Sequence, residues 1–121
     1  MRIAVVASPG PHAPGDEVRG TVTVVEGGPA RRLTVALRLM EVTATVRAAA
    51  RTVDGGVLAE GELRAGEGHA FRIALPADAV PCHAAANSAL LWMAAARVDR
   101  RGPDVADAVV LDVRLPDSTG P

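Results

Sequence analysis

The stretch "HAPGDEVRGTVTVV", His12–Val25, joins a turn to a strand and decides the fold class of the chain. Pro14 fixes its own φ angle and Gly15 can adopt a φ that other residues avoid, so we expect the chain to turn there. From residue 18 onward, small or apolar residues occupy every second position, which places them on one face of a β-sheet. Gly20 lies inside this strand, where a glycine predicts a bulge or the close approach of another backbone.

The same alternation recurs in three further segments: Leu33 to Leu39, Phe71 to Leu75 and Val109 to Leu115. Prolines lie outside these segments, and "EGGPA", "VDGGV", "RAGEGH" and "DRRGPD" are typical turn sequences between strands. Short strands separated by such turns indicate an all-β sandwich or barrel. The expected strands are near Arg2–Ala7, Glu17–Val25, Arg32–Val42, Thr45–Thr52, Val57–Leu63, Ala70–Leu75, Ala89–Asp99 and Ala108–Leu115.

The segment Ala84–Arg101 leaves a helix open as an alternative, because alanine is the best helix former. Against a helix, Leu90, Trp92 and Val98 share one face of an extended chain, and we therefore expect a strand. Trp92 and Phe71 fall on the apolar side of this alternation, which predicts that both aromatic side chains lie in the core.

The composition excludes several classes of function. Of the 121 residues, 49% are hydrophobic and 22% are charged, which is typical of a globular domain. We expect one domain over residues 1–115 and a short frayed tail over residues 116–121. A net charge of −1, one Phe, one Trp and no Tyr argue against a nucleic-acid partner. No apolar run is long enough for an integral membrane segment.

The basic and sulfur-containing residues indicate the source and the compartment. All 13 basic residues are arginine, which together with abundant Ala, Val and Gly predicts a bacterium with a GC-rich genome. The single cysteine, Cys82, cannot form an internal disulfide, so we expect a reducing, cytoplasmic location.

The order of these motifs resembles that of the arrestin-like domain superfamily. "APGDEVRGTVTV" is similar to the turn and Val-x-Gly-x-Val strand of such domains, and "RRLTVALRLMEVT" to the strand that follows. "GELRAGEGHAFRIALPADAVPC" resembles a Gly turn, a Phe-bearing strand and a Leu-Pro stretch. "ALLWMAAARVDRRGPDVADAVVLDV" resembles an aromatic-bearing strand, an Asp-containing loop and a final valine strand. The resemblance covers residues 12–115 and extends to bacterial sporulation-control proteins.

This resemblance implies an immunoglobulin-like antiparallel β-sandwich of seven or eight strands, acting as a scaffold or adaptor without catalysis. Members of the superfamily carry two tandem sandwiches, whereas this chain has the length of a single-domain form. A homodimer is therefore expected by analogy.

Candidate chemistry is sparse. Cys82 and His83, with Asn87 nearby, suggest a cysteine nucleophile, but adjacent residues in an extended chain point to opposite faces. The histidines His12, His69 and His83 lie in separate predicted loops without the spacing of known metal sites. Loops at one end of a sandwich can converge, so a metal or small-molecule site using His69, Cys82 and His83 remains the alternative hypothesis. No cofactor is implied.

The loop around Asp99, Asp104 and Asp107 offers hard oxygen ligands for Ca²⁺, but the intervening arginines favour a turn whose charges pair with one another. We therefore expect a non-enzymatic module that binds an unidentified protein partner or a second copy of itself. Edge strands accept such partners, and the candidate edges are Glu17–Val25 and Ala108–Leu115.

Overall fold

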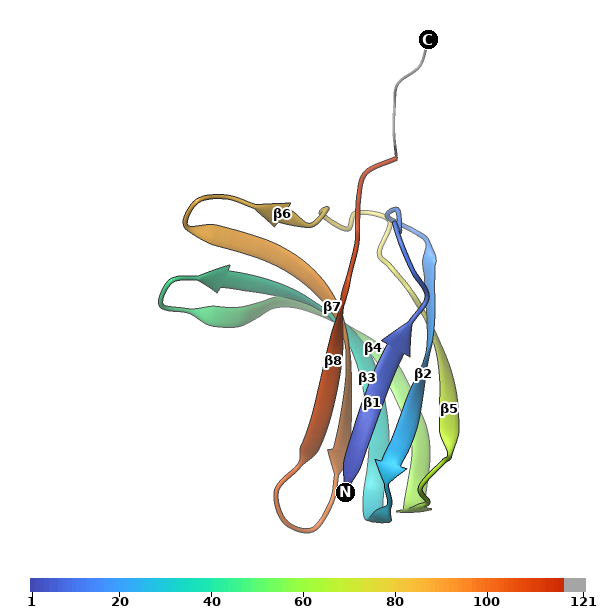
Figure 1. Ribbon diagram of the computed structural model, residues 1–121. Helices are drawn as coiled ribbons and strands as arrows, with labels where there is room; N and C mark the ends of the chain where they lie inside the picture. The colour runs from blue at the N-terminus through green and yellow to red at the C-terminus, as the bar shows by residue number, and fades with distance from the viewer. Residues whose placement is uncertain (117–121) are drawn as a thin grey trace.

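The computed structural model describes residues 1–116, which form eight β-strands in two antiparallel sheets (Figure 1). The three-stranded sheet has the order β1 (Arg2–Ala7), β2 (Glu17–Glu26), β5 (Gly68–Ala74). The five-stranded sheet has the order β4 (Arg47–Leu63), β3 (Gly28–Thr43), β7 (Ser88–Asp99), and both β6 (His83–Ala84) and β8 (Val105–Leu111) pair with β7. The expected antiparallel β-sandwich is confirmed. Of the expected tail, residues 117–121 lie outside the described residues.

The core lies between the two sheets and follows the alternation of the sequence. Val18, Val22 and Val24 on β2 are fully buried and belong to the same cluster as Leu37 on β3 and Trp92 on β7. Each of these strands therefore presents one apolar face to the interior, as a period of two requires. The expectation of a strand within residues 84–101 is confirmed, because β7 occupies most of this segment and no helix forms in residues 1–116.

Phe71 and Trp92 are 4% and 0% exposed, which confirms both as core residues. Phe71 is the direct cross-strand partner of Gly20. A Cβ atom on Gly20 would overlap the ring of Phe71 and the carbonyl oxygen of Val6. The glycine in the middle of β2 is therefore explained by the close approach of an aromatic ring and a neighbouring backbone.

The turn before β2 forms as expected. Gly15 has a φ of +88°, and the backbone amide of Asp16 donates to the carbonyl of Ala13 at 3.0 Å. The Asp16 carboxylate in turn accepts the amide of Ala13 at 2.8 Å. Leu75, which directly follows β5 of the same sheet, donates its amide to the Asp16 carbonyl at 2.8 Å, so the turn is tied to the end of β5.

Three expectations about strand boundaries are wrong. The segments Thr45–Thr52 and Val57–Leu63 belong to one strand, β4, because "VDGGV" forms a bulge that continues the strand instead of reversing it. At this bulge the amide of Gly56 donates to the Asp54 carboxylate at 2.8 Å. Pro29, expected outside the strands, is the second residue of β3. The two-residue strand β6 was not expected.

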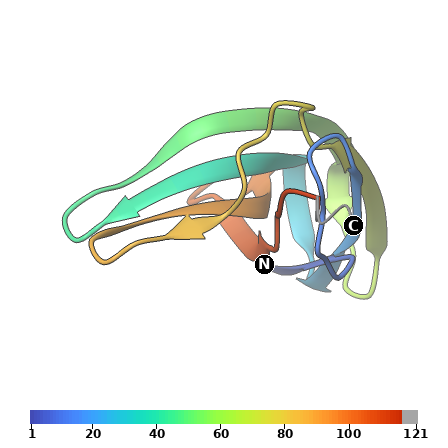
Figure 2. The same cartoon turned by 90° about the horizontal axis from the view of Figure 1, so that it is seen from above.

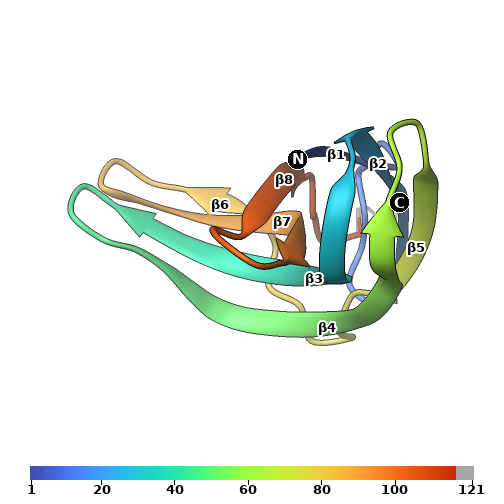
Figure 3. The ribbon, with the colours of Figure 1, turned by 90° about the horizontal axis from the view of Figure 1, so that it is seen from below.

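Two hairpins project from the sandwich as an arm, residues 38–52 and 83–93. The β3–β4 and β6–β7 hairpins extend side by side away from the three-stranded sheet, which leaves the far half of the five-stranded sheet without a facing layer (Figures 2 and 3). All residues from 44 to 52 and from 83 to 88 are exposed. The ends of the two hairpins are therefore accessible, whereas Leu39, Met40 and Trp92 at the base of the arm are buried.

The sheet order corrects one of the two expected edges. The segment Glu17–Val25 forms β2, which is paired on both sides by β1 and β5, so this expectation is wrong. The segment Ala108–Leu115 is an edge only in part. Its first residues belong to β8, which pairs with β7 alone in the sheet order, whereas Val113 forms a bridge with His12 and accepts the Cys82 amide. Within residues 1–116, no helix has the length and apolar character needed to cross a membrane.

Candidate functional site

The longest open strand edge of the described chain is the first part of β4. Residues 47–52 pair with β3 on one side, and all six side chains are exposed. The other half of β4 runs beside β5, where Gly55 lies against the side chain of Ile73. The backbone groups of residues 47–52 that point away from β3 thus face solvent at the rim of the arm.

The remaining edges in the described residues are short, covered or beside another strand, as β5 is beside the second half of β4. The outer edge of β1 lies beside β8, and the Asp107 carboxylate of β8 accepts the backbone amide of Val5 at 2.8 Å. The Val5 amide therefore already has an acceptor and is not free to bond to a partner strand. The edge of β6 has only two residues, His83 and Ala84. Residues 47–52 consequently offer the most extended backbone template in the described residues.

The outer face of the arm, which points away from the core, carries an apolar patch. Leu39 belongs to the core cluster, so its neighbour Met40 faces the other side of β3. Met40 is 8% exposed although it lies outside the core cluster, and it pairs directly with Leu91 on β7 and Ala49 on β4. Val42 follows on the same face of β3 and is half-buried. These side chains form the outer patch: Met40, Val42, Ala49, Leu91 and Met93.

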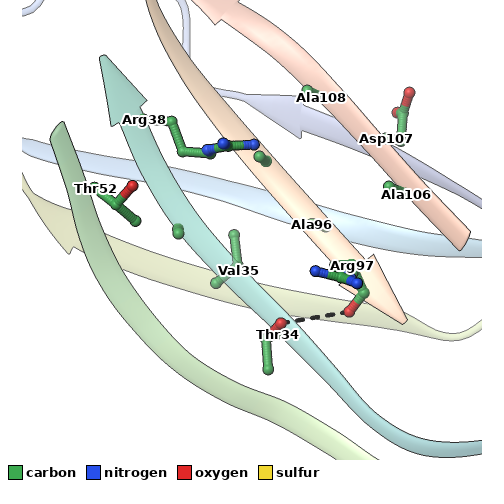
Figure 4. A pocket seen from close by; sticks show the side chains of 11 residues that line it. Thr34, Val35, Arg38, Thr52, Ala96, Arg97, Ala106, Asp107 and Ala108 are labelled. Carbon is green, nitrogen blue, oxygen red and sulfur yellow. Dashed lines mark hydrogen bonds between the residues drawn. The ribbon is translucent and has the colours of Figure 1, made fainter. Parts of the chain in front are cut away.

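An open hollow of about 530 Å³ adjoins the outer patch on the same sheet face. Its floor contains Ala36, Ala95 and Ala108, which are direct neighbours across β3, β7 and β8. Figure 4 shows Arg38 extending from β3 toward β7 at one end of the hollow and Arg97 at the other. The Thr34 hydroxyl donates to the Arg97 carbonyl at 3.5 Å.

The charges on the arm are mainly positive. Arg38, Arg47 and Arg51 oppose a single carboxylate, Glu41, although the whole chain has a formal net charge of −1. Arg51 forms an ion pair with Asp78 at 3.0 Å. Among residues 1–116, Arg38 and Arg47 form no ion pair, and both side chains are exposed. Two unneutralised cations therefore border the outer patch.

Cys82 and His83 do not form a nucleophile and base pair. The Cys82 thiol donates to the carbonyl oxygen of Leu111 at 3.3 Å, and its amide donates to the carbonyl of Val113 at 2.9 Å. His83 is exposed on β6 opposite Leu90, and Asn87 lies in the bend between β6 and β7. The thiol is thus held against the end of β8 by backbone contacts, with no base in hydrogen-bond reach among the described residues.

The histidines lie in separate surroundings. His12 is 7% exposed, and its Nε2 atom lies 3.1 Å from the carbonyl oxygen of Ser8. His69 is on β5, where its Nε2 atom lies 3.1 Å from the Glu67 carboxylate. Nowhere in residues 1–116 do three His, Cys, Asp or Glu side chains gather in a geometry that could hold a metal ion. The described residues therefore give no geometric support to a metal site at His69, Cys82 and His83.

The three aspartates of the β7–β8 region have separate partners. Asp104 pairs with Arg97, Asp99 lies 3.8 Å from Arg32, and Asp107 accepts the Val5 amide. The charges of the turn therefore do not pair with one another as expected: the aspartates take partners outside it, and Arg100 donates to the Pro103 carbonyl. Among the described residues the carboxylates do not converge in a geometry that could hold a cation.

Sequence reasoning missed the open edge of β4, although it placed a strand near Thr45–Thr52. The sequence "RAAARTV", residues 47–53, did carry a signal for an exposed strand: three small alanines stand between two arginines and are followed by the β-branched Thr and Val. What could not be derived was that β3 pairs with β4 and β7, which makes β4 the outermost strand.

No protein-family model matches the chain, and no curated protein matches it at a significant level. Among solved structures, the chain is similar to Spo0M, a sporulation control protein from Bacillus subtilis, with a TM-score of 0.66 and 19% sequence identity. The match covers 93% of this chain and 49% of the other, so this chain spans about half the length of the protein that it matches. The resemblance in motif order and this agreement in architecture lead to the same result: the chain has the arrestin-like β-sandwich fold.

Proposed function

We propose that the chain is a non-enzymatic protein-interaction module that accepts an extended segment of a partner along residues 47–52 of β4. The observation that carries the proposal is the edge itself, which is paired on one side, exposed on the other and held away from the sandwich by the arm. Added strands gain affinity from main-chain hydrogen bonds and specificity from side chains on both faces of the new strand.

The surroundings of the reactive side chains support binding over catalysis. The Cys82 thiol donates a hydrogen bond to the Leu111 carbonyl, and the His69 ring lies within hydrogen-bond distance of the Glu67 carboxylate. A catalytic constellation needs a nucleophile, a base and an orienting group within reach of one another. Cys82 and His69 are therefore each occupied by a structural contact, and the exposed His83 side chain forms no hydrogen bond with Cys82.

The partner strand comes either from another protein or from a second copy of this chain. The alanines at positions 48–50 leave room for either, because small side chains let a neighbouring backbone approach without displacing long ones. Sedimentation velocity of the purified chain over a range of concentrations separates the two cases, since a homodimer forms without any added partner.

A photo-crosslinking amino acid at position 49 tests the proposal in the native organism. The matched control carries the same group at Ala70, an exposed alanine on β5 in the other sheet. We expect one discrete adduct from position 49, mapped by mass spectrometry to an extended segment of the partner, and none from position 70. Equal labelling from both positions would contradict an edge-specific interaction.

We further propose a cytoplasmic location in a bacterium with a GC-rich genome. The free thiol of Cys82 supports a reducing compartment, and the exclusive use of arginine among the basic residues supports the GC-rich source. Fractionation of the native organism followed by immunoblotting tests the location directly.

A further inference from the structure

We infer that the segment added to β4 belongs to a different protein and is acidic, with carboxylates on the side that continues the outer face of the arm. This inference rests on the proposed function, because it names the chemistry of the strand that the open edge accepts.

The register places two unpaired arginines on the outer face. Arg47 pairs with Val42, and Arg38 pairs with Thr52. Val42 and Arg38 each lie an even number of residues from Met40 along β3, so they share its outer face. Glu41, the single carboxylate of the arm, lies between these positions and points to the opposite face. The outer face beside the edge is therefore positively charged and lacks a compensating carboxylate within the arm.

A partner strand would continue the sheet and bring its outward side chains next to Arg47, Ala49 and Thr52. Opposite charges on neighbouring strands attract, and like charges directly opposite repel. Carboxylates at these positions would find a cation in Arg47. Aliphatic side chains at the intervening positions would lie on the inner side next to Ala48. An extended segment that alternates acidic and aliphatic residues meets both conditions.

The same charges disfavour a second copy as the occupant. Two copies of β4 paired in antiparallel fashion about Ala49 would bring Arg47 of each copy level with Arg51 of the other. The two side chains lie on opposite faces, because Arg47 pairs with the outward Val42 and Arg51 with the inward Leu39, so each face of the shared edge would gain positive charge from both copies. The ion pair with Asp78 offsets the charge of Arg51 only in part, because Asp78 and Arg51 are both exposed to solvent. The arginines at each end of the alanines therefore oppose self-pairing and favour a partner of opposite charge.

Three labelled peptides of equal length serve as probes, alternating valine with glutamate, with glutamine or with lysine. We expect the glutamate peptide to bind tightest by fluorescence anisotropy at about 0.05 M salt, with its advantage shrinking at about 0.5 M because screening weakens exposed charge pairs. In the variant Arg38→Glu/Arg47→Glu, the order of affinities should reverse and the lysine peptide should bind tightest. The control variant Arg64→Glu/Arg72→Glu changes the same charge at exposed positions outside the arm and should keep the order.

Amide hydrogen exchange of residues 47–52 separates failure of the inference from failure of the proposed function. Slower exchange there with the glutamate peptide alone supports both. Equal protection by all three peptides, or an unchanged order in the arm variant, overturns the acidic preference and leaves the edge intact as a docking site. Unchanged exchange with every peptide overturns both. Circular dichroism of each variant verifies that the sandwich is still folded.

Discussion

Truncation of Trp92 measures how far the sandwich depends on one side chain. Trp92 is 0% exposed on β7, directly between Leu39 of β3 and Leu111 of β8. Burying an aromatic side chain of this kind removes about 150–250 Å² from water, which corresponds to about 4–6 kcal/mol at about 25 cal/mol per Å². Alanine keeps part of this burial, and extended-chain areas are upper bounds. We therefore expect Trp92→Ala to lower the free energy of unfolding by about 3–5 kcal/mol.

A second variant separates packing from hydrogen bonding. The indole Nε1 of Trp92 donates to the carbonyl oxygen of Val80 at 2.7 Å, which ties the segment between β5 and β6 to β7. Trp92→Phe keeps an aromatic ring and removes this donor. We expect a smaller loss of about 1–3 kcal/mol, set mainly by the carbonyl left without its partner, and faster amide exchange in residues 76–82.

Urea unfolding followed by far-ultraviolet circular dichroism is the appropriate assay, because both variants lack the single tryptophan of the chain. The slope of the free energy against urea should stay constant, so that a change in midpoint reports stability alone. A loss below about 1 kcal/mol for Trp92→Ala would refute the reasoning, since surface substitutions produce changes of that size. Equal losses for both variants would assign the whole effect to the hydrogen bond.

Three smaller perturbations test other contacts by the same urea assay. Gly20→Ala should cost about 1–3 kcal/mol through overpacking, and a gain in stability would contradict the close approach described at this position. Asp107→Ala removes the acceptor of the Val5 amide and should cost about 1–2 kcal/mol, with faster exchange of that amide; an unchanged exchange rate would mean that the contact does not protect the edge of β1. Asp104→Ala breaks an exposed ion pair with Arg97 and should cost less than about 1 kcal/mol, whereas a loss above about 2 kcal/mol would show that the pair has a structural role.

Local physical rules predicted the parts of the fold that depend on neighbours in sequence. Alternation placed Val18 and Val24 in the core because side-chain direction in a strand is set by the backbone alone. The turn at Gly15 followed from its conformational freedom, and the strand around Trp92 followed from a shared face that outweighed the helix propensity of the surrounding alanines. Each of these inferences needs only a few consecutive residues.

Features that depend on long-range pairing could not be predicted in the same way. The glycines of "VDGGV" suit a turn and a bulge equally well, and only the pairing of β4 with β3 along its whole length selects the bulge. The edge position is likewise a property of sheet order. Glu17–Val25 has the alternation of any half-buried strand, and nothing in it shows that β1 and β5 flank it on both sides.

The contrast between the edges of β1 and β4 links these observations to the proposed function. Proteins blunt exposed edges with charges and covering groups to avoid unwanted pairing. At β1 a carboxylate from β8 accepts one backbone amide, and β8 itself lies beside the edge, so a partner strand has no room there. At β4 the backbone is left open and the only obstacles are arginines, which repel a second copy and attract a segment of opposite charge. The edge of β4 is protected by charge alone and can therefore select partners by their charge, whereas the edge of β1 is covered and accepts none. For this reason we expect a partner strand to bind along residues 47–52.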